Sequence, residues 1–122
     1  MMLLDTNIIV DVLRQEPDAI RFIDALKSKP YVSVVTVQEL YHGARSAREE
    51  GFIEELLFGA IIVLVTVPIA RSAGQFMRHY APTHGLDDLD ALIAATAEHH
   101  GLDLATLNVK HFPMFRRLKP AY

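Results

Sequence analysis

Short, continuously apolar stretches alternate along this chain with segments in which apolar residues recur at helical spacing. The apolar stretches have the character of buried strands and lie at 2–4, 31–35, 61–67 and 104–106. The helical patterns lie at 8–13, 17–28, 36–44, 51–58, 68–81 and 89–99. Strands that are apolar on both faces are typical of a parallel sheet covered by helices on both sides. The sequence therefore predicts an α/β fold, a three-layer sandwich around a central parallel sheet of four to five strands.

The size and composition of the chain fit one core. A length of 122 residues with 51% hydrophobic content is enough to bury a continuous core, so we expect a single domain over 1–122. The chain has no cysteine, which excludes a disulfide framework and a thiolate zinc site and favours a reducing cytoplasm. Its longest apolar run, 60–65, is too short to span a bilayer, so we expect a soluble protein.

The charge of the chain constrains its partners. A net charge of -3 argues against the broad basic surface of a nucleic-acid packaging protein. It is compatible with a nuclease, because a bound divalent metal neutralises an acidic active site. The segment 110–122, with Arg116, Arg117 and Lys119, is the clearest concentration of basic residues and a candidate for a short edge strand.

Three acidic residues are expected at the beginnings of helices. Asp5 directly follows the first strand, Glu39 lies in the first turn of the helix after the second, and Asp90 lies in the first turn of a helix that starts at 87–88. In a parallel sheet, strand carboxyl ends and the following helix N-termini meet at one edge, where ligands bind. We therefore expect the three carboxylates to converge in one cleft.

Converging carboxylates suit a hard divalent cation. Mg²⁺ prefers oxygen ligands, keeps several waters and is held by a few carboxylates together with substrate phosphate; Mn²⁺ is expected to substitute. Such a metal activates water for attack on phosphorus and stabilises the leaving oxygen. The pattern therefore favours phosphodiester hydrolysis.

Each acid also has a purely structural interpretation. Thr36 to Glu39 has the sequence of a capping box, in which the glutamate returns a hydrogen bond to the backbone. Asp90 could interact favourably with the positive end of a helix dipole, with Asp87 or Asp88 as the cap of that helix. Asp5 could cap the helix that follows it. Asp5 is the hardest to explain in this way, because an acid at a buried strand end is costly without a partner.

Polar residues flank the first and last strand ends. Thr6, Asn7, Thr106 and Asn108 have a turn or cap role as the simpler interpretation and the orientation of metal-bound water as the functional one. Taken singly, each of these residues favours the turn or cap role.

Four segments together resemble a known family. They are LLDTN at 3–7, SVVTVQEL at 33–40, DALIAATA at 90–97 and ATLNVKHF at 105–112. In this order and spacing they resemble PIN domains, specifically VapC-type toxins, over nearly the whole chain. The resemblance implies a metal-dependent endoribonuclease in which Asp5, Glu39 and Asp90 match three acids of the metal site and Thr6 matches its supporting hydroxyl. It also implies that a cognate antitoxin neutralises the protein and that the protein forms a homodimer.

The sequence departs from the family pattern near its end. The family often has a further acid in the last motif, where this chain has Asn108 and His111; Asp87 or Asp88 could compensate. We therefore predict an Mg²⁺-dependent ribonuclease with Asp5, Glu39 and Asp90 at the metal, with Thr6 and Asn108 orienting ligands or water. Nearby basic residues such as Lys110 are expected to contact phosphate.

Three alternatives remain open from sequence. A haloacid-dehalogenase-like phosphatase would need a second acid two residues after Asp5, where this chain has Asn7. A phospho-accepting receiver domain would need an acidic pair after the first strand and a strand-end lysine, and Lys110 does not fit that position. A PIN fold that acts only as a binding module is the third, and metal-dependent cleavage would distinguish it.

Overall fold

A parallel sheet of four short strands forms the centre of the computed structural model, which describes residues 1–83 and 85–122. The strands are β1 (Met2–Leu4), β2 (Tyr31–Ser33), β3 (Ile61–Val63) and β4 (Asp103–Ala105). They lie in the order β3-β2-β1-β4, and every neighbouring pair is parallel. Because β1 lies between β2 and β4, the residues that follow these three strands are neighbours at one edge. The predicted α/β fold with a parallel sheet is confirmed.

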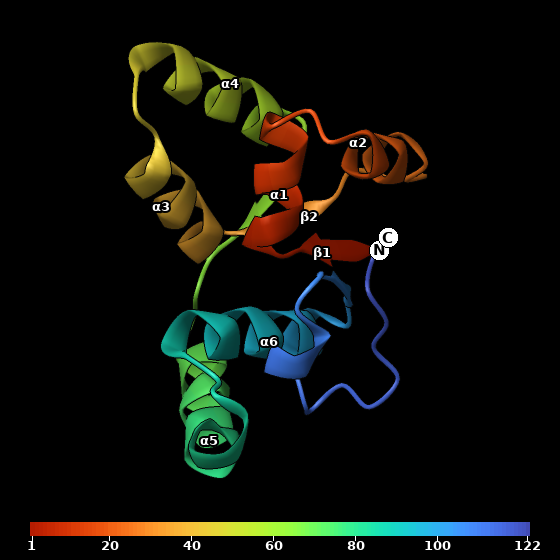
Figure 1. Cartoon of the computed structure of the whole chain (residues 1–122). Coiled ribbons are helices and arrows are strands. Elements are labelled where there is room, and N and C mark those ends of the chain that lie inside the picture. Colours follow the sequence, from red (N-terminus) through yellow and green to blue (C-terminus); the bar gives the residue numbers. More distant parts are fainter.

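Helices cover both faces of the sheet (Figure 1). The helices of one layer are α1 (Thr6–Leu13), α2 (Pro17–Asp24), α3 (Val34–Gly43) and α4 (Ala47–Phe58). The helices of the other layer are α5 (Val67–His84) and α6 (Asp88–His100). Each layer has its own buried cluster against the sheet, with Leu4, Ile8 and Val32 in one and Leu3, Ile93 and Leu104 in the other.

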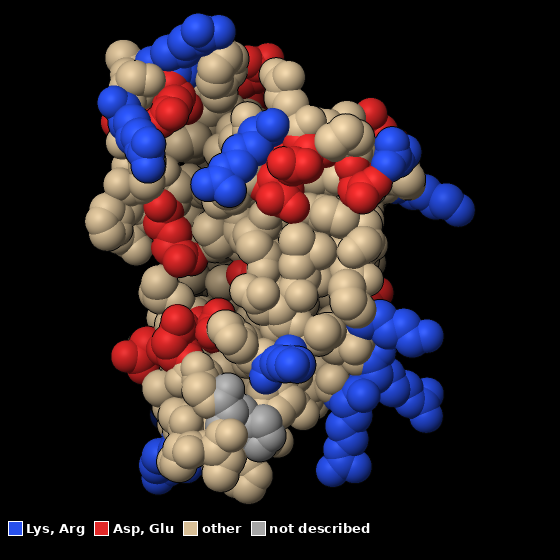
Figure 2. Space-filling model, viewed as in Figure 1, with Lys and Arg blue, Asp and Glu red and all other residues tan. Residues whose placement is uncertain are grey.

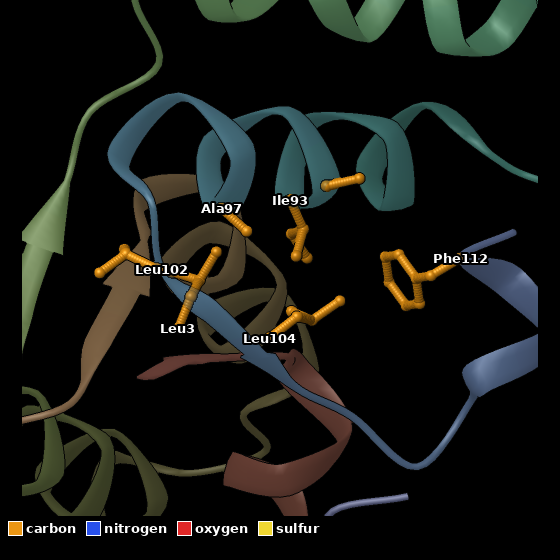
Figure 3. Packing of buried hydrophobic residues seen from close by; sticks show 7 residues of the cluster. Leu3, Ile93, Ala97, Leu102, Leu104 and Phe112 are labelled. Atoms are coloured by element: carbon orange, nitrogen blue, oxygen red, sulfur yellow. The ribbon is translucent and has the colours of Figure 1, made fainter. Parts of the chain in front are cut away.

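Helix α6 lies deepest in the structure. It is buried at Ala91 and from Ile93 to Ala97, and its alanines allow close packing against both the sheet and α5. Figure 3 shows Ile93 and Ala97 facing Leu3 and Leu104, with the Phe112 ring beside them. Since Phe112 is buried too, the chain after β4 is fixed to the same core. This packing holds the N-terminus of α6 near the ends of β1 and β4.

The second strand is shorter than predicted. We expected a strand over 31–35 and a helix beginning at Thr36, but β2 ends at Ser33 and α3 begins at Val34. The Ser33 hydroxyl accepts a hydrogen bond from the Val35 amide at 3.2 Å and caps the helix. The β-branched Val34 and Val35 are therefore helical, because the cap and burial outweigh their strand preference.

The third strand was predicted to be fully buried over 61–67, which is wrong. β3 covers only Ile61–Val63 and forms an edge of the sheet, where Ile61 and Ile62 are 41% and 39% exposed. Helix α5 then begins at Val67. An edge strand has one unpaired side, so an apolar sequence alone did not reveal its exposure.

Other boundaries move by a few residues. α2 ends at Asp24 rather than near Ser28, and α4 begins at Ala47 because Ser46 caps it. α5 continues past residue 81, and Gly101 ends α6 in the left-handed conformation with φ 62°, as its position predicted. The C-terminal segment adds no edge strand; it contains the short 3₁₀ helix η1 (Val109–His111). No described helix is both long and apolar enough to cross a membrane.

Candidate active site

Asp5 stands at the carboxyl end of β1, where it is only 6% exposed. One carboxylate oxygen accepts a hydrogen bond from the Thr6 amide at 2.8 Å, so Asp5 caps α1, as its structural interpretation proposed. The other oxygen accepts a hydrogen bond from the Thr106 hydroxyl at 2.7 Å. Both oxygens are thus oriented by fixed donors, and the carboxylate is held in one position.

Thr106 links three polar groups at the end of β4. Its hydroxyl is fully buried, donates to Asp5, and accepts from the Asn108 amide at 3.0 Å. The Asn7 side-chain nitrogen lies 3.5 Å from the same hydroxyl, and the Asn7 carbonyl oxygen accepts from the Leu107 amide at 3.4 Å. The sequence indicated Thr106 only as one polar flanking residue, because its partner Asp5 is 101 positions away.

Glu39 lies in the middle of α3, not in the first turn as predicted, because the helix begins at Val34, and it does not close a capping box. The predicted box is wrong, because the cap of α3 is Ser33 and Thr36 already lies inside the helix. The Glu39 carboxylate accepts a hydrogen bond from the Thr6 hydroxyl at 2.6 Å. The buried Thr36 hydroxyl lies 3.0 Å from that of Thr6. These contacts orient Glu39 toward the end of β1.

Asp90 occupies the first turn of α6, as predicted. Asp87 is the cap of this helix, and its carboxylate accepts a hydrogen bond from the Asp90 amide at 2.8 Å. The Asp90 carboxylate itself is free of the capping role, and one of its oxygens lies 3.4 Å from Nδ1 of His111. His111 in η1 therefore faces the acidic residues from the segment that follows β4.

These residues line one cleft of about 350 Å³ at the carboxyl edge of the sheet. Its lining consists of Asp5, Thr6, Asn7, Val10, Asp11, Arg14, Glu39, Asp87, Leu89, Asp90 and Asn108. All five predicted site residues are thus brought together, and Asp87 joins them. Asp88 and Lys110 do not line the cleft.

The crowding of acids perturbs their protonation. Burial, followed by repulsion from Asp87 and Asp5, raises the pKa of Asp90 to about 6. Burial also raises the pKa of Asp5, against the lowering effect of its hydrogen bond from Thr106. A bound cation would reduce the repulsion between these buried acids.

The donor set fits a hard divalent cation that keeps part of its water shell. Within residues 1–83 and 85–122, no three His, Cys, Asp or Glu side chains are close enough to hold a metal ion by themselves. A closed cage of protein ligands is typical of structural zinc, whereas Mg²⁺ usually takes one or two carboxylates together with water and substrate oxygens. Carboxylates that line one cleft without forming a cage therefore fit Mg²⁺ better than zinc.

Comparison with known proteins identifies the chain. The model of the PIN domain family matches residues 2–118. The chain belongs to the PIN-domain family. This membership confirms the resemblance of the four sequence motifs and excludes the phosphatase and receiver alternatives.

Relatives of this PIN domain include VapC ribonucleases. It is 42% identical over 126 residues to Ribonuclease VapC19 of Mycobacterium tuberculosis (strain ATCC 25618 / H37Rv), with 100% of both chains covered. It is 42% identical over 125 residues to Ribonuclease VapC10 of the same strain, covering 100% of this chain and 93% of the relative. Its fold is similar to that in a solved toxin-antitoxin complex from Klebsiella pneumoniae, with a TM-score of 0.86, 27% identity, and 100% and 98% of the two chains covered. The chain is a VapC-family PIN domain, of the ribonuclease toxin type.

Proposed function

We propose that residues 1–122 form a single VapC-family PIN domain whose acidic cleft hydrolyses internal phosphodiester bonds of RNA with the help of Mg²⁺. The observation that carries this proposal is the cleft itself, which Asp5 lines from the end of β1, Glu39 from α3 and Asp90 from α6. Asp5, Glu39 and Asp90 would hold the metal together, one or two of them by direct contact and the rest through its bound water, and Mn²⁺ would be an acceptable substitute. When bound, the metal supplies activation of water and neutralisation of charge on the phosphate.

The protein's own groups orient the carboxylates. Thr106 holds Asp5 through a hydroxyl donor at 2.7 Å, and Thr6 holds Glu39 through one at 2.6 Å. Outer hydrogen bonds of this kind fix the direction of ligands and are costly to remove. The Asn108 side chain makes no cap bond to η1, and it lines the cleft, so it is the group we assign to orienting water or substrate.

The position of the family's fourth acid is filled differently here. His111 lies against Asp90, and Asp87 lines the cleft while one of its oxygens caps α6. We assign the support of a second metal position to Asp87 rather than Asp88, since Asp88 does not line the cleft.

A groove next to the active site fits a segment of a cognate antitoxin. It has a volume of about 360 Å³, lies between α1, α3 and α4, and shares Val10, Arg14 and Glu39 with the acidic cleft. Its walls combine apolar side chains such as Phe52 with charged ones such as Arg45, which suits an amphipathic segment. Growth inhibition by a Phe52→Asp variant should persist in cells that express the cognate antitoxin, whereas the antitoxin should rescue cells expressing the wild-type chain. Rescue of both would contradict this assignment.

Exposed apolar residues support a homodimer. Phe58 is 88% exposed, Leu64 66% and Val67 73%, and they run from the end of α4 past the edge strand β3 into α5. Large apolar side chains left this exposed on successive segments are candidates for an association site. Light scattering should give twice the mass of one chain for the wild type and the mass of one chain for a Phe58→Asp/Leu64→Asp variant. A wild-type monomer would contradict the dimer.

The function is tested by incubating the antitoxin-free chain with structured and single-stranded RNAs in Mg²⁺, Mn²⁺ or EDTA. We expect cleavage at internal positions of the RNA with either metal and none in EDTA. We place the reaction in the cytoplasm, where RNA substrates are present. The binding-module alternative is distinguished by calorimetry. Absence of both cleavage and binding of Mg²⁺ or Mn²⁺ would favour a PIN fold that only binds a partner.

A further inference from the structure

The last part of the chain separates basic from acidic residues. Residues 104–122 contain four of the 12 Lys and Arg residues and no Asp or Glu, which leaves eight basic residues against all 15 acidic ones in 1–103. The four are Lys110, Arg116, Arg117 and Lys119, and all are exposed. In the described part of the chain, none of them forms an ion pair. Their charge is therefore available to an outside partner.

The segment that carries these cations is fixed, although most of it lacks regular secondary structure. Phe112 is buried, and Met114, Phe115 and Leu118 pack against the same core cluster under α6. Backbone hydrogen bonds link Phe115 to Phe112 and Leu118 to Phe115. Apolar side chains thus point inward, and the basic ones between them are held outward (Figure 2, lower right).

Both ends of the segment are attached to the active site. It leaves β4 through Thr106, whose hydroxyl holds Asp5, and passes Asn108 in the cleft. It returns where the Ala121 amide donates to the Thr106 carbonyl, and the Tyr122 hydroxyl then donates to Asp11, another residue of the cleft. An RNA strand with one phosphate in the cleft can therefore continue along the basic residues of this segment.

We propose that Arg116 and Arg117, supported by Lys110 and Lys119, form a phosphate-binding surface for single-stranded RNA outside the acidic cleft. The inference rests on the proposed ribonuclease function. A cleft lined by Asp5, Asp11, Glu39, Asp87 and Asp90 repels a polyanion until metal is bound, so binding energy must come from elsewhere. Guanidinium groups are suited to phosphate, and among the residues that the structure describes neither Arg116 nor Arg117 has an acidic partner.

Binding is measured in EDTA, so that RNA is bound without being cleaved. The probe is a fluorescein-labelled single-stranded RNA of mixed sequence, and the protein is the full chain freed of antitoxin. The variant is Arg116→Ala/Arg117→Ala. Its matched control is Lys27→Ala/Lys29→Ala, which removes the same net charge from exposed positions in the loop before β2, at the opposite edge of the sheet. Neither variant removes a core side chain.

The arginine variant should raise the Kd for RNA at least about tenfold at low salt. The slope of log K against log salt should shrink by about 0.7 for each phosphate that the variant no longer binds. The lysine control should keep the wild-type Kd and slope. Equal effects of the two variants would show that only net charge matters for RNA binding. No effect of either variant would indicate that the basic segment binds an acidic protein and not RNA. Either result would overturn the proposal. Failure of the ribonuclease function would appear separately, as the absence of cleavage by the wild-type chain in Mg²⁺.

Discussion

The Thr106 hydroxyl donates a hydrogen bond of 2.7 Å to Asp5 across a sequence separation of 101 residues. The contact joins the end of β4 to the end of β1, and both side chains are buried. It fixes the carboxylate that we place at the metal. The sequence positions of the two residues give no sign of the contact, which exists only because the two strands are neighbours in the sheet.

Thr106→Val keeps the shape of the side chain and removes this donor. The variant should lose about 1–3 kcal/mol of folding stability, because the buried Asp5 oxygen and the Asn108 amide lose their partner. It should also bind Mg²⁺ about ten- to a hundredfold more weakly by calorimetry. Thr96→Val is the matched control, since Thr96 is equally buried but donates to the Leu92 carbonyl within α6. Equal Mg²⁺ affinities of the two variants would show that Thr106 has no part in the site.

Thr6 is predicted to position Glu39 through its hydroxyl. Thr6→Val should weaken Mg²⁺ binding about tenfold or more, because Glu39 loses its 2.6 Å hydrogen bond. Thr6→Ser keeps a hydroxyl at the same position and should bind Mg²⁺ almost as tightly as the wild type. Mg²⁺ binding by Thr6→Ser as weak as that of Thr6→Val would contradict the prediction, because it would show that the methyl group of Thr6 matters and not its hydroxyl.

The raised pKa of Asp90 predicts how stability depends on pH. Because that pKa rises from 3.8 to about 6 in the folded chain, folding favours the protonated acid. In EDTA, the free energy of unfolding should therefore fall as the pH rises from about 4 to about 6, and the raised pKa of Asp5 acts in the same direction. Denaturant titrations across this range should show a weaker fall for Asp90→Asn, while Asp103→Asn, at an exposed position of β4, should follow the wild type. An equal fall for Asp90→Asn would contradict the assignment.

His111 gives a prediction whose sign depends on metal. His111→Asp places a carboxylate beside Asp90, where the two negative charges repel, so the Tm in EDTA should decrease. The same change adds an oxygen ligand, so the rise in Tm produced by Mg²⁺ should exceed that of the wild type. His111→Asn is the uncharged control. A Mg²⁺-induced rise no larger than in this control would show that residue 111 does not reach the metal.

The local sequence predicted those elements of the fold that the pattern of apolar residues determines. The buried stretch before Asp5 and the long apolar face around Ala91 to Ala97 were recognisable, because burial on both sides leaves no polar alternation. The α/β fold and its parallel sheet followed from the alternation of elements. The start of α3 was missed because the Ser33 cap and its surroundings decide it, not the strand preference of the valines that follow.

The sequence predicted the acids of the cleft and, through the family resemblance, Thr6 as a supporting hydroxyl, but not which side chains the supporting groups contact. Asp5, Glu39 and Asp90 could be placed together because parallel strands and the following helices share an edge. The role of Glu39 as an acceptor from Thr6, rather than a capping residue, depends on the packing of α1 against α3. The hub at Thr106 and the contact of His111 with Asp90 likewise depend on contacts between distant segments.

Cleavage by matched carboxylate variants tests the central claim most directly. Asp5→Asn and Asp103→Asn remove the same charge, one inside the cleft and one at an exposed position of β4. Both are compared with the wild-type chain on one RNA that the wild type cleaves in Mg²⁺, with EDTA as the blank. The account predicts cleavage by the wild type and by Asp103→Asn, abolished in EDTA, and at least about a hundredfold slower cleavage by Asp5→Asn. Cleavage that continues in EDTA, or at the wild-type rate in Asp5→Asn, would contradict it.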